Sequence, residues 1–379
     1  MINDTLIWFL LLPVIGALLI WWLLGHRKEH LPLAAVYLVA SCAIVGLAFA
    51  ISHGSATSDT EIWNGQITAK ERKHGEYTRS YECNCTETCS GTGSTRSCTK
   101  TCMTCYEDHY TVHWYAHSTL GTFTIDSLDR TSRSVYQTPD PQRYTIIRQG
   151  EPCSKTNTYT NYVQAVPETL FKPSGETLRQ RFAKLIPAYP DQVYDYYRIN
   201  RFLTPGYSTP DAKLWNDSLS ELLKERGPRK QVNTVVVIAK TADPNYVHAL
   251  RDAWEGANKN DVVLVIGSAE WPTIDFVEVI SWTKKELFKI QLRDEVLALG
   301  TIQRQPILDV LAKQIDTTFE RRRMREFEYL QAEIDPPSWL LVILALLMAV
   351  GAFAIVVFSR PAPRSATAFD RVRNLLRVR

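Results

Sequence analysis

The chain lacks charged side chains over three long stretches, residues 6–24, 31–51 and 339–358. Each stretch has ~20 residues, which is enough for a helix to cross the hydrocarbon layer of a bilayer. Soluble protein cores rarely contain three such runs, so the sequence predicts three transmembrane helices with the lipid bilayer as a partner. Transporters and channels place charged groups at the middle of the membrane. The absence of charged side chains from all three stretches therefore argues against a transport pathway within one chain.

The sequence also lacks the short motifs of several large enzyme classes. It contains no G-x-x-x-x-G-K-[ST] phosphate loop, no G-x-S-x-G nucleophile turn and no H-E-x-x-H metal motif. Its formal net charge is only +3, which gives no basis for binding a nucleic acid. We therefore predict no catalytic residues, no cofactor and no nucleic-acid partner.

Positive charges set the expected orientation in the membrane. No Lys or Arg precedes the first apolar stretch, whereas Arg27 and Lys28 follow it, as in an uncleaved anchor rather than a signal peptide. The tail after Phe358 is rich in arginine and contains one acid, Asp370. With three spans, this tail and the short loop at residues 25–30 share one side, which we expect to be the cytoplasm. The N-terminus and the region between spans two and three are then outside, periplasmic or extracellular.

Six cysteines between residues 83 and 105 lie in this exported region. Exported thiols oxidise, so the cluster predicts structural disulfide bonds. The spacing is C-x-C-x3-C-x8-C-x3-C-x2-C, and partners are expected to come from opposite halves of the cluster because close neighbours pair only with strain. Spacing alone leaves the pairing open, and one further cysteine remains for an unpaired thiol or a link between chains. The disulfide candidates are Cys83, Cys85, Cys89, Cys98, Cys102, Cys105 and Cys153.

A metal site is the alternative use of this segment. Cys102 and Cys105 are followed by His109, His113 and His117, and zinc binds Cys and His at short spacings. A four-residue spacing places the three imidazoles on one face of a helix or a strand. We expect a strand with Tyr110, Val112 and Trp114 pointing inward, so that the histidines lie on a solvated face.

Residues 63–171 are rich in Thr, Tyr, Ser and Val and predict a small β domain, with strands at Tyr110–Tyr115 and Arg143–Ile147. The region after it predicts alternating helices and strands. Gly227-Pro228 is expected to end the first of these helices. By residue number, we expect helices at 211–225, 245–257 and 306–319, the last with an open extension to residue 330, and strands at 232–239, 261–266, 276–282 and 287–292.

This order, with the apolar strand Asn260–Ile266 after a helix, resembles the TPM domain family over about residues 208–320. The resemblance implies an α/β sandwich associated with envelope or thylakoid membranes and often tethered by one transmembrane helix. Some members bind divalent cations and phosphatase activity is reported for some, but no acidic cluster here matches a family site. The cysteine-rich half resembles, more faintly, uncharacterised membrane proteins of large tailed bacteriophages.

The sequence thus predicts an α+β membrane protein with three transmembrane helices, a small disulfide-rich β domain and a compact TPM-like α/β sandwich. Its expected function is non-enzymatic: the ectodomain binds or scaffolds other envelope components, with a protein partner and a homo-oligomer both compatible with the pattern. The alternatives are a membrane-tethered, phosphatase-like hydrolase and a zinc- or redox-handling protein that uses the Cys/His segment. The expected segments are 1–30 and 31–52 (two spans with a tight loop), 53–171 (β ectodomain), 172–207 (connector), 208–335 (α/β domain), 336–358 (third span) and 359–379 (basic tail).

Overall fold

The computed structural model describes residues 4–25, 28–90, 97–166, 176–193 and 199–359. The expected basic tail and parts of the expected connector lie outside these residues. The chain divides into two compact units, each of which is described by itself. The first unit contains Met1–Thr60, Thr158–Lys172 and Arg322–Arg379, and the second contains Glu61–Asn157 and Pro173–Arg321.

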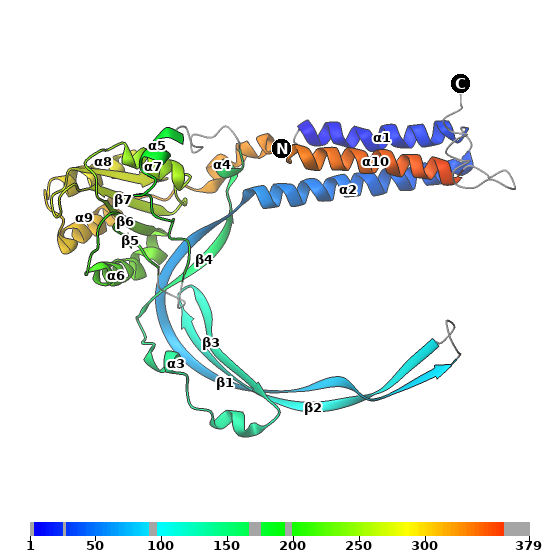
Figure 1. Ribbon diagram of the computed structural model, residues 1–379, viewed down its shortest axis with the longest axis horizontal. Helices are drawn as coiled ribbons and strands as arrows, with labels where there is room; N and C mark the ends of the chain where they lie inside the picture. Colours follow the sequence, from blue (N-terminus) through cyan, green and yellow to red (C-terminus); the bar gives the residue numbers. More distant parts are fainter. Residues whose placement is uncertain (1–3, 26–27, 91–96, 167–175, 194–198, 360–379) are drawn as a thin grey trace. The chain divides into compact units, whose positions relative to one another are not determined.

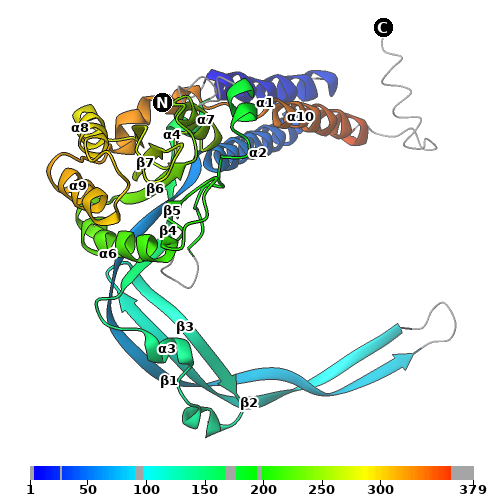
Figure 2. The ribbon, with the colours of Figure 1, turned by 60° about the vertical axis from the view of Figure 1, so that its left-hand side comes forward.

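Three apolar helices dominate the first unit: α1 (Asp4–Leu23), α2 (Leu31–Thr57) and α10 (Ser338–Ser359). They pack side by side, as Figure 1 and Figure 2 both show. Gly16 leaves room for the ring of Tyr37, whose hydroxyl donates a hydrogen bond of 3.0 Å to the Met348 carbonyl oxygen. All three are long and apolar enough to cross a membrane, so the prediction of three candidate spans is confirmed at the level of length and composition.

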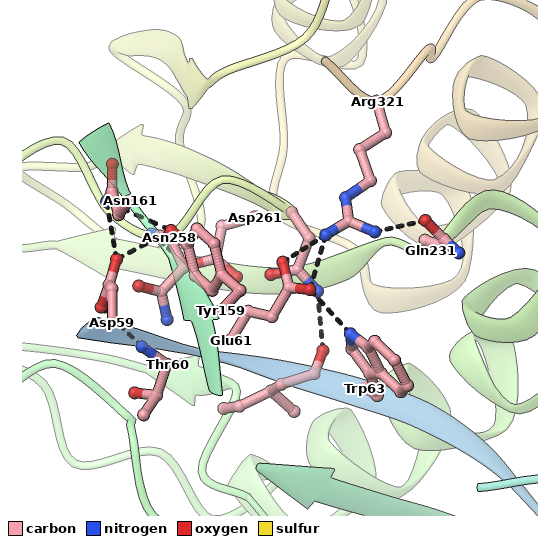
Figure 3. A network of polar contacts seen from close by, with 12 residues as sticks. Asp59, Thr60, Glu61, Trp63, Tyr159, Asn161, Gln231, Asn258, Asp261 and Arg321 are labelled. Carbon is pink, nitrogen blue, oxygen red and sulfur yellow. Dashed lines mark hydrogen bonds and ion pairs between the residues drawn. The ribbon is translucent and has the colours of Figure 1, made fainter. Parts of the chain in front are cut away.

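Short elements complete the first unit. Asn161 caps helix α4 (Tyr162–Ala165) by accepting hydrogen bonds from the backbone N–H groups of Val163 and Gln164, each at 3.2 Å. Its own side-chain amide donates to Asp59, which also accepts from the Tyr159 hydroxyl, both at 2.7 Å (Figure 3). A 3₁₀ helix, η4 (Met324–Glu333), precedes α10.

A mixed four-stranded sheet forms the α/β part of the second unit. Its order is β5 (Phe202–Leu203), β6 (Asn233–Ala239), β7 (Asp261–Gly267), β8 (Phe276–Ser281). The first three strands are parallel and β8 is antiparallel. Alternate residues of the fully buried β6 pack on opposite faces of the sheet. Val236 belongs to the core that the sheet forms with α6 (Ala212–Lys230), α8 (Glu286–Leu297) and α9 (Arg304–Thr317). Val237 belongs to the core on the other face, with α5 (Glu176–Arg181) and α7 (Tyr246–Ala253). This confirms the buried strands predicted from the continuous apolar runs.

Two predicted strands are wrong. Residues 287–292 belong to helix α8, where Phe288, Leu292 and Val296 form a buried stripe at a spacing of four. Residues 143–147 fall mostly in the short helix α3 (Gln142–Ile146). A short apolar run fits both periods, and here packing against the sheet selects the helix.

The ends of three predicted helices also differ from those observed. Helix α6 continues through Gly227-Pro228 to Lys230 and is capped by Gln231, which has the left-handed backbone conformation (φ 51°). Helix α9 ends at Thr317 rather than continuing to residue 330, because Phe319 turns into the core. The helix predicted at 245–257 is the shorter α7.

A second sheet has the order β3 (Gly121–Arg130), β2 (Ser97–Ser118), β1 (Ser58–Ser90), β4 (Pro152–Thr160), and its outermost stretch of β1 and β2 extends well past β3 (Figure 2). Val112 and Trp114 of β2 are fully buried against Val135 and Tyr144, as the predicted alternation requires. Val135 lies in the 3₁₀ helix η3 (Arg133–Gln137). The mixed α+β fold and the disulfide-rich β region are thus both present.

Candidate functional site

One exposed feature of the second unit is the distal ribbon, which we define as residues 77–90 of β1 and 97–109 of β2. The pairing of β3 with β2 begins only at Tyr110, opposite Arg130, so the distal ribbon has two strands. Its side chains are exposed or half-buried throughout the residues whose burial is described. An isolated two-stranded hairpin is marginally stable in water, so something other than a hydrophobic core must hold these strands together.

Three disulfide bonds hold the distal ribbon: Cys83–Cys105, Cys85–Cys102 and Cys89–Cys98. Each joins a cysteine of β1 to one of β2, which confirms that partners come from opposite halves of the cluster. The seventh candidate, Cys153, is unpaired and only 1% exposed, and burial raises the pKa of its thiol to about 11. Because a reactive thiol needs both access and ionisation, Cys153 is poorly placed to link two chains.

A β-bulge in β1 makes this pairing possible. The partner of Cys83 is Met103 and that of Thr86 is Thr101, so β1 contains one extra residue between them. The extra residue is Asn84, which has a positive φ of 47° that Asn tolerates better than most residues.

The bulge moves Cys83 and Cys85 to opposite faces of the distal ribbon, although they are only two residues apart. Without it they would share a face, since side chains in a strand alternate with a period of two. Cys102 and Cys105, three residues apart on regular β2, lie on opposite faces in any case. The bulge therefore matches the faces of β1 to those of β2, so that each cysteine has a partner on its own side.

The structure does not bring the candidate zinc ligands together. Cys102 and Cys105 belong to two different disulfides. His109, His113 and His117 lie on β2 as expected, but four residues of strand separate neighbours by ~13 Å, too far for two of them to bind one ion.

Each of the three histidines has a different neighbour instead. The Nδ1 of His109 lies 2.8 Å from Asp129, and the Nε2 of His117 lies 2.8 Å from Glu71. His113 stacks on Tyr115, with ring centroids 5.8 Å apart.

A side-chain clamp marks the place where three strands become two. Asp129 of β3 accepts a hydrogen bond of 2.6 Å from the Tyr77 hydroxyl of β1 and contacts His109 of β2. The hydrogen bond from Tyr77, and to a lesser degree that from His109, lowers the pKa of the Asp129 carboxyl. The Tyr77–Asp129 hydrogen bond also raises the pKa of the Tyr77 hydroxyl. The clamp ties the end of β3 across both strands of the base of the distal ribbon.

Buried polar contacts hold the root of β1 against the α/β sheet. Arg201 is fully buried, and its guanidinium donates to Asn64 of β1, Ser154 of β4 and Asn233 of β6. The Asn260 side chain donates to the backbone carbonyl of Ile62 at 2.7 Å.

Gly227 lies against the same root, where an added Cβ would stand 2.6 Å from Asn64. This close approach explains why glycine occupies a position inside helix α6.

An ion pair closes the same root (Figure 3). Glu61 of β1 is 1% exposed and accepts two hydrogen bonds of 2.5 Å from Arg321 and one of 2.8 Å from the Trp63 indole. Arg321 also donates to Gln231 at the end of α6. A charge removed from water in this way remains stable only while its partner is in place.

A buried carboxyl lies next to this network. Asp261, the first residue of β7, is fully buried and accepts hydrogen bonds from the Tyr189 hydroxyl, the Asn233 side chain and the Asn258 backbone N–H. Burial is the largest influence and raises the pKa of this carboxyl. The sequence carries a signal for these residues: Asn233 and Asp261 are polar side chains at the first position of strands that continue as β-branched apolar runs.

One cleft of the second unit has a volume of about 520 Å³ and lies along α6. Its charged residues include Lys213 and Asp217, which pair with each other at 2.5 Å. Self-neutralised charges of this kind do not indicate a particular ligand. No family model, curated protein or solved structure matches the chain, so its function has to be inferred from the residues themselves.

Proposed function

We propose that this chain is an integral membrane protein whose disulfide-bonded ectodomain binds and holds other envelope components without catalysing a reaction. The observation that carries the proposal is the distal ribbon, a two-stranded arm that is stapled by three disulfides and exposed on both faces. Tyr106 and Met103 are 73% and 64% exposed on opposite faces of it. Large apolar side chains presented on a rigid element are typical of binding surfaces.

The root of β1 supports the same proposal. A binding arm transmits force to its anchor, and the anchor here combines the buried Glu61–Arg321 ion pair with the hydrogen bonds of Arg201. Both are expensive to break because each leaves a buried group without its partner. The α/β part thereby acts as the base on which the distal ribbon stands.

The proposed orientation places the N-terminus and the second unit outside the cytoplasm, periplasmic or extracellular, and the arginine-rich tail inside. Two independent features support it. The basic residues after the first and third apolar helices follow the positive-inside rule. The disulfides require an oxidising compartment, which the bacterial periplasm provides.

We also propose that the α/β part is TPM-like. The order α6, β6, α7, β7, β8, with helices on both faces of the sheet, supports this assignment. The proposal carries over no catalytic residue, because the buried acid of this part, Asp261, is engaged by Tyr189, Asn233 and Asn258.

Site-specific crosslinking in native membranes tests the proposed function. A photo-crosslinking amino acid replaces Tyr106 or, separately, Thr88, and Leu214 on the exposed side of α6 is the matched control. We expect reproducible crosslinked products from each of the two ribbon positions, and we expect the Leu214 control to give none of those products. Absence of any ribbon product, or the same products from all three positions, would contradict a binding role for the distal ribbon.

A further inference from the structure

One edge of the distal ribbon is free. β2 pairs with β1 along one side, and along the other side it pairs with β3 only from Tyr110 to Ser118. Among the residues that the structure describes, none pairs with Ser97–His109 on that second side. Figures 1 and 2 both show β1 and β2 continuing as a pair beyond the end of β3.

The free edge of β2 also lacks two features that prevent one strand from pairing with another, proline and a β-bulge. Residues 97–109 contain no proline, and the β-bulge at Asn84 interrupts β1 rather than β2. Disulfides on both faces keep the strand extended and in place. Unprotected edges of this kind add strands through backbone hydrogen bonds.

A two-fold axis restricts how two copies of this edge can pair. Along a strand, the backbone N–H and C=O groups of successive residues point alternately to its two edges. Two opposed residues of an antiparallel pair must both face the partner strand or both face away from it. When the two strands are copies of one segment, an even-numbered residue therefore stands opposite an even-numbered one, and an odd-numbered residue opposite an odd-numbered one. One of the few registers that meet this condition has the two-fold axis passing between the Thr104 residues of the two copies. It places Lys100 opposite Asp108 of the second copy, and by symmetry it does so twice.

Charges favour this register over its neighbours. With Cys102, Met103 or Cys105 on the axis, Lys100 stands opposite no acid. With Thr104 on the axis, a row of alternating charge runs across the sheet, because Glu87 already stands opposite Lys100 within each ribbon and Thr78 opposite Asp108. No two like charges are opposed between Lys100 and Asp108, and opposed unlike charges stabilise antiparallel pairs.

The same register covers the exposed side chains of β2. On one face Tyr106 stands opposite Cys102 of the second copy, beside its Cys85–Cys102 disulfide. On the other face Met103 stands opposite Cys105 of the second copy. Within that copy's own ribbon, Cys105 stands opposite Tyr81, so Met103 also lies near this ring. Each of these exposed side chains thus gains a cross-strand neighbour and loses part of its exposed surface in the pair.

We propose that two copies of this chain join through the free edge of β2 over Lys100–Asp108, with Thr104 on the two-fold axis, to form a continuous four-stranded sheet. This rests on the proposed function in that it assigns the distal ribbon a partner, a second copy of the chain. The self-complementary charges of one edge carry it.

Charge reversal on the full-length chain tests the proposed dimer. Sedimentation of the detergent-solubilised protein over a concentration series gives the dissociation constant. Lys100→Glu and Asp108→Lys each replace two attractive pairs by two repulsive ones, so each is expected to weaken the dimer about tenfold. The double variant restores the opposite charges and is expected to dimerise like the unchanged chain.

Glu107→Lys is the matched control. It places a like charge opposite Arg79 within the ribbon, as Lys100→Glu does opposite Glu87, but across the axis it faces Thr101. It should leave the dissociation constant unchanged. A monomer at every concentration, or a dimer insensitive to both charge reversals, overturns the proposal. If heterologous crosslinks from Thr88 persist in that case, the proposed binding function stands and only the identity of the partner is wrong.

Discussion

Moving one cysteine by a single residue tests whether the bulge at Asn84 sets the disulfide pairing. The double variant Cys102→Ser/Met103→Cys transfers the thiol to the opposite face of β2. Cys85 then has no partner on its own side, and the face that receives the new thiol already holds the Cys83–Cys105 bond. We expect this variant to lose one disulfide, whereas deletion of Asn84 retains all three. The deletion removes the bulge and makes Cys83 and Cys85 adjacent, so they still point to opposite faces.

The cost of the lost bond follows from the loop that it closes. Cys85 and Cys102 are 17 residues apart, and closing a loop of that length stabilises a fold by about 3 kcal/mol in the chain-entropy model. The Cys83–Cys105 bond already restricts the same segment from outside, so the loss should be nearer ~2 kcal/mol. Because the distal ribbon has no core, this loss should be confined to it.

Thiol counting on the denatured, unreduced protein measures the outcome. The unchanged chain should show two free thiols, Cys42 and Cys153, and the deletion variant should show the same two. The moved-cysteine variant should show two more, together with faster amide hydrogen exchange in the distal ribbon and unchanged exchange in β6 and β7. Two thiols in the moved-cysteine variant, or additional thiols in the deletion variant, would refute the register argument.

Two further predictions concern the root of β1. Glu61→Gln removes the buried carboxylate that pairs with the half-buried Arg321 and should lower the free energy of unfolding by about 3 kcal/mol. Glu71→Gln, at an exposed contact with His117, should change it by under about 0.5 kcal/mol. Equal losses in denaturant titrations would contradict the stabilising role of the Glu61–Arg321 pair. Asp261 has a raised pKa in the folded state, so the native protein binds its proton more tightly than the unfolded chain, and stability should fall as pH rises from the ordinary carboxyl range toward that raised pKa. Melting temperatures over that range should show a smaller fall in Asp261→Asn, and an identical slope in the two proteins would contradict the assignment.

Features that depend on one segment could be predicted from that segment. The three apolar helices follow from length and hydrophobicity alone, since each run is sufficient by itself to favour a lipid environment. The strands β6 and β7 follow from continuous β-branched runs that only a sheet covered on both faces accommodates. The inward side of β2 follows from strict alternation around Val112 and Trp114.

Features that depend on the meeting of distant segments could not be predicted in this way. Residues 287–292 fit a strand and a helix equally well until the sheet beside them is known. The histidines at a spacing of four do share a face, but extension along a strand separates them. The zinc hypothesis did not include that distance.

The sequence by itself determined that this chain has three candidate membrane spans, a dense cysteine cluster and an α/β region, because each of these is a matter of local composition and period. Only the tertiary structure decided which cysteines pair, since that depends on one extra residue in β1 relative to β2. Only the tertiary structure brought Asn64, Arg201 and Asn233 into one buried network, because their hydrogen bonds join segments with no relation in sequence. Pairing register and buried polar contacts are properties of two segments at once, and a pattern within one segment cannot contain them.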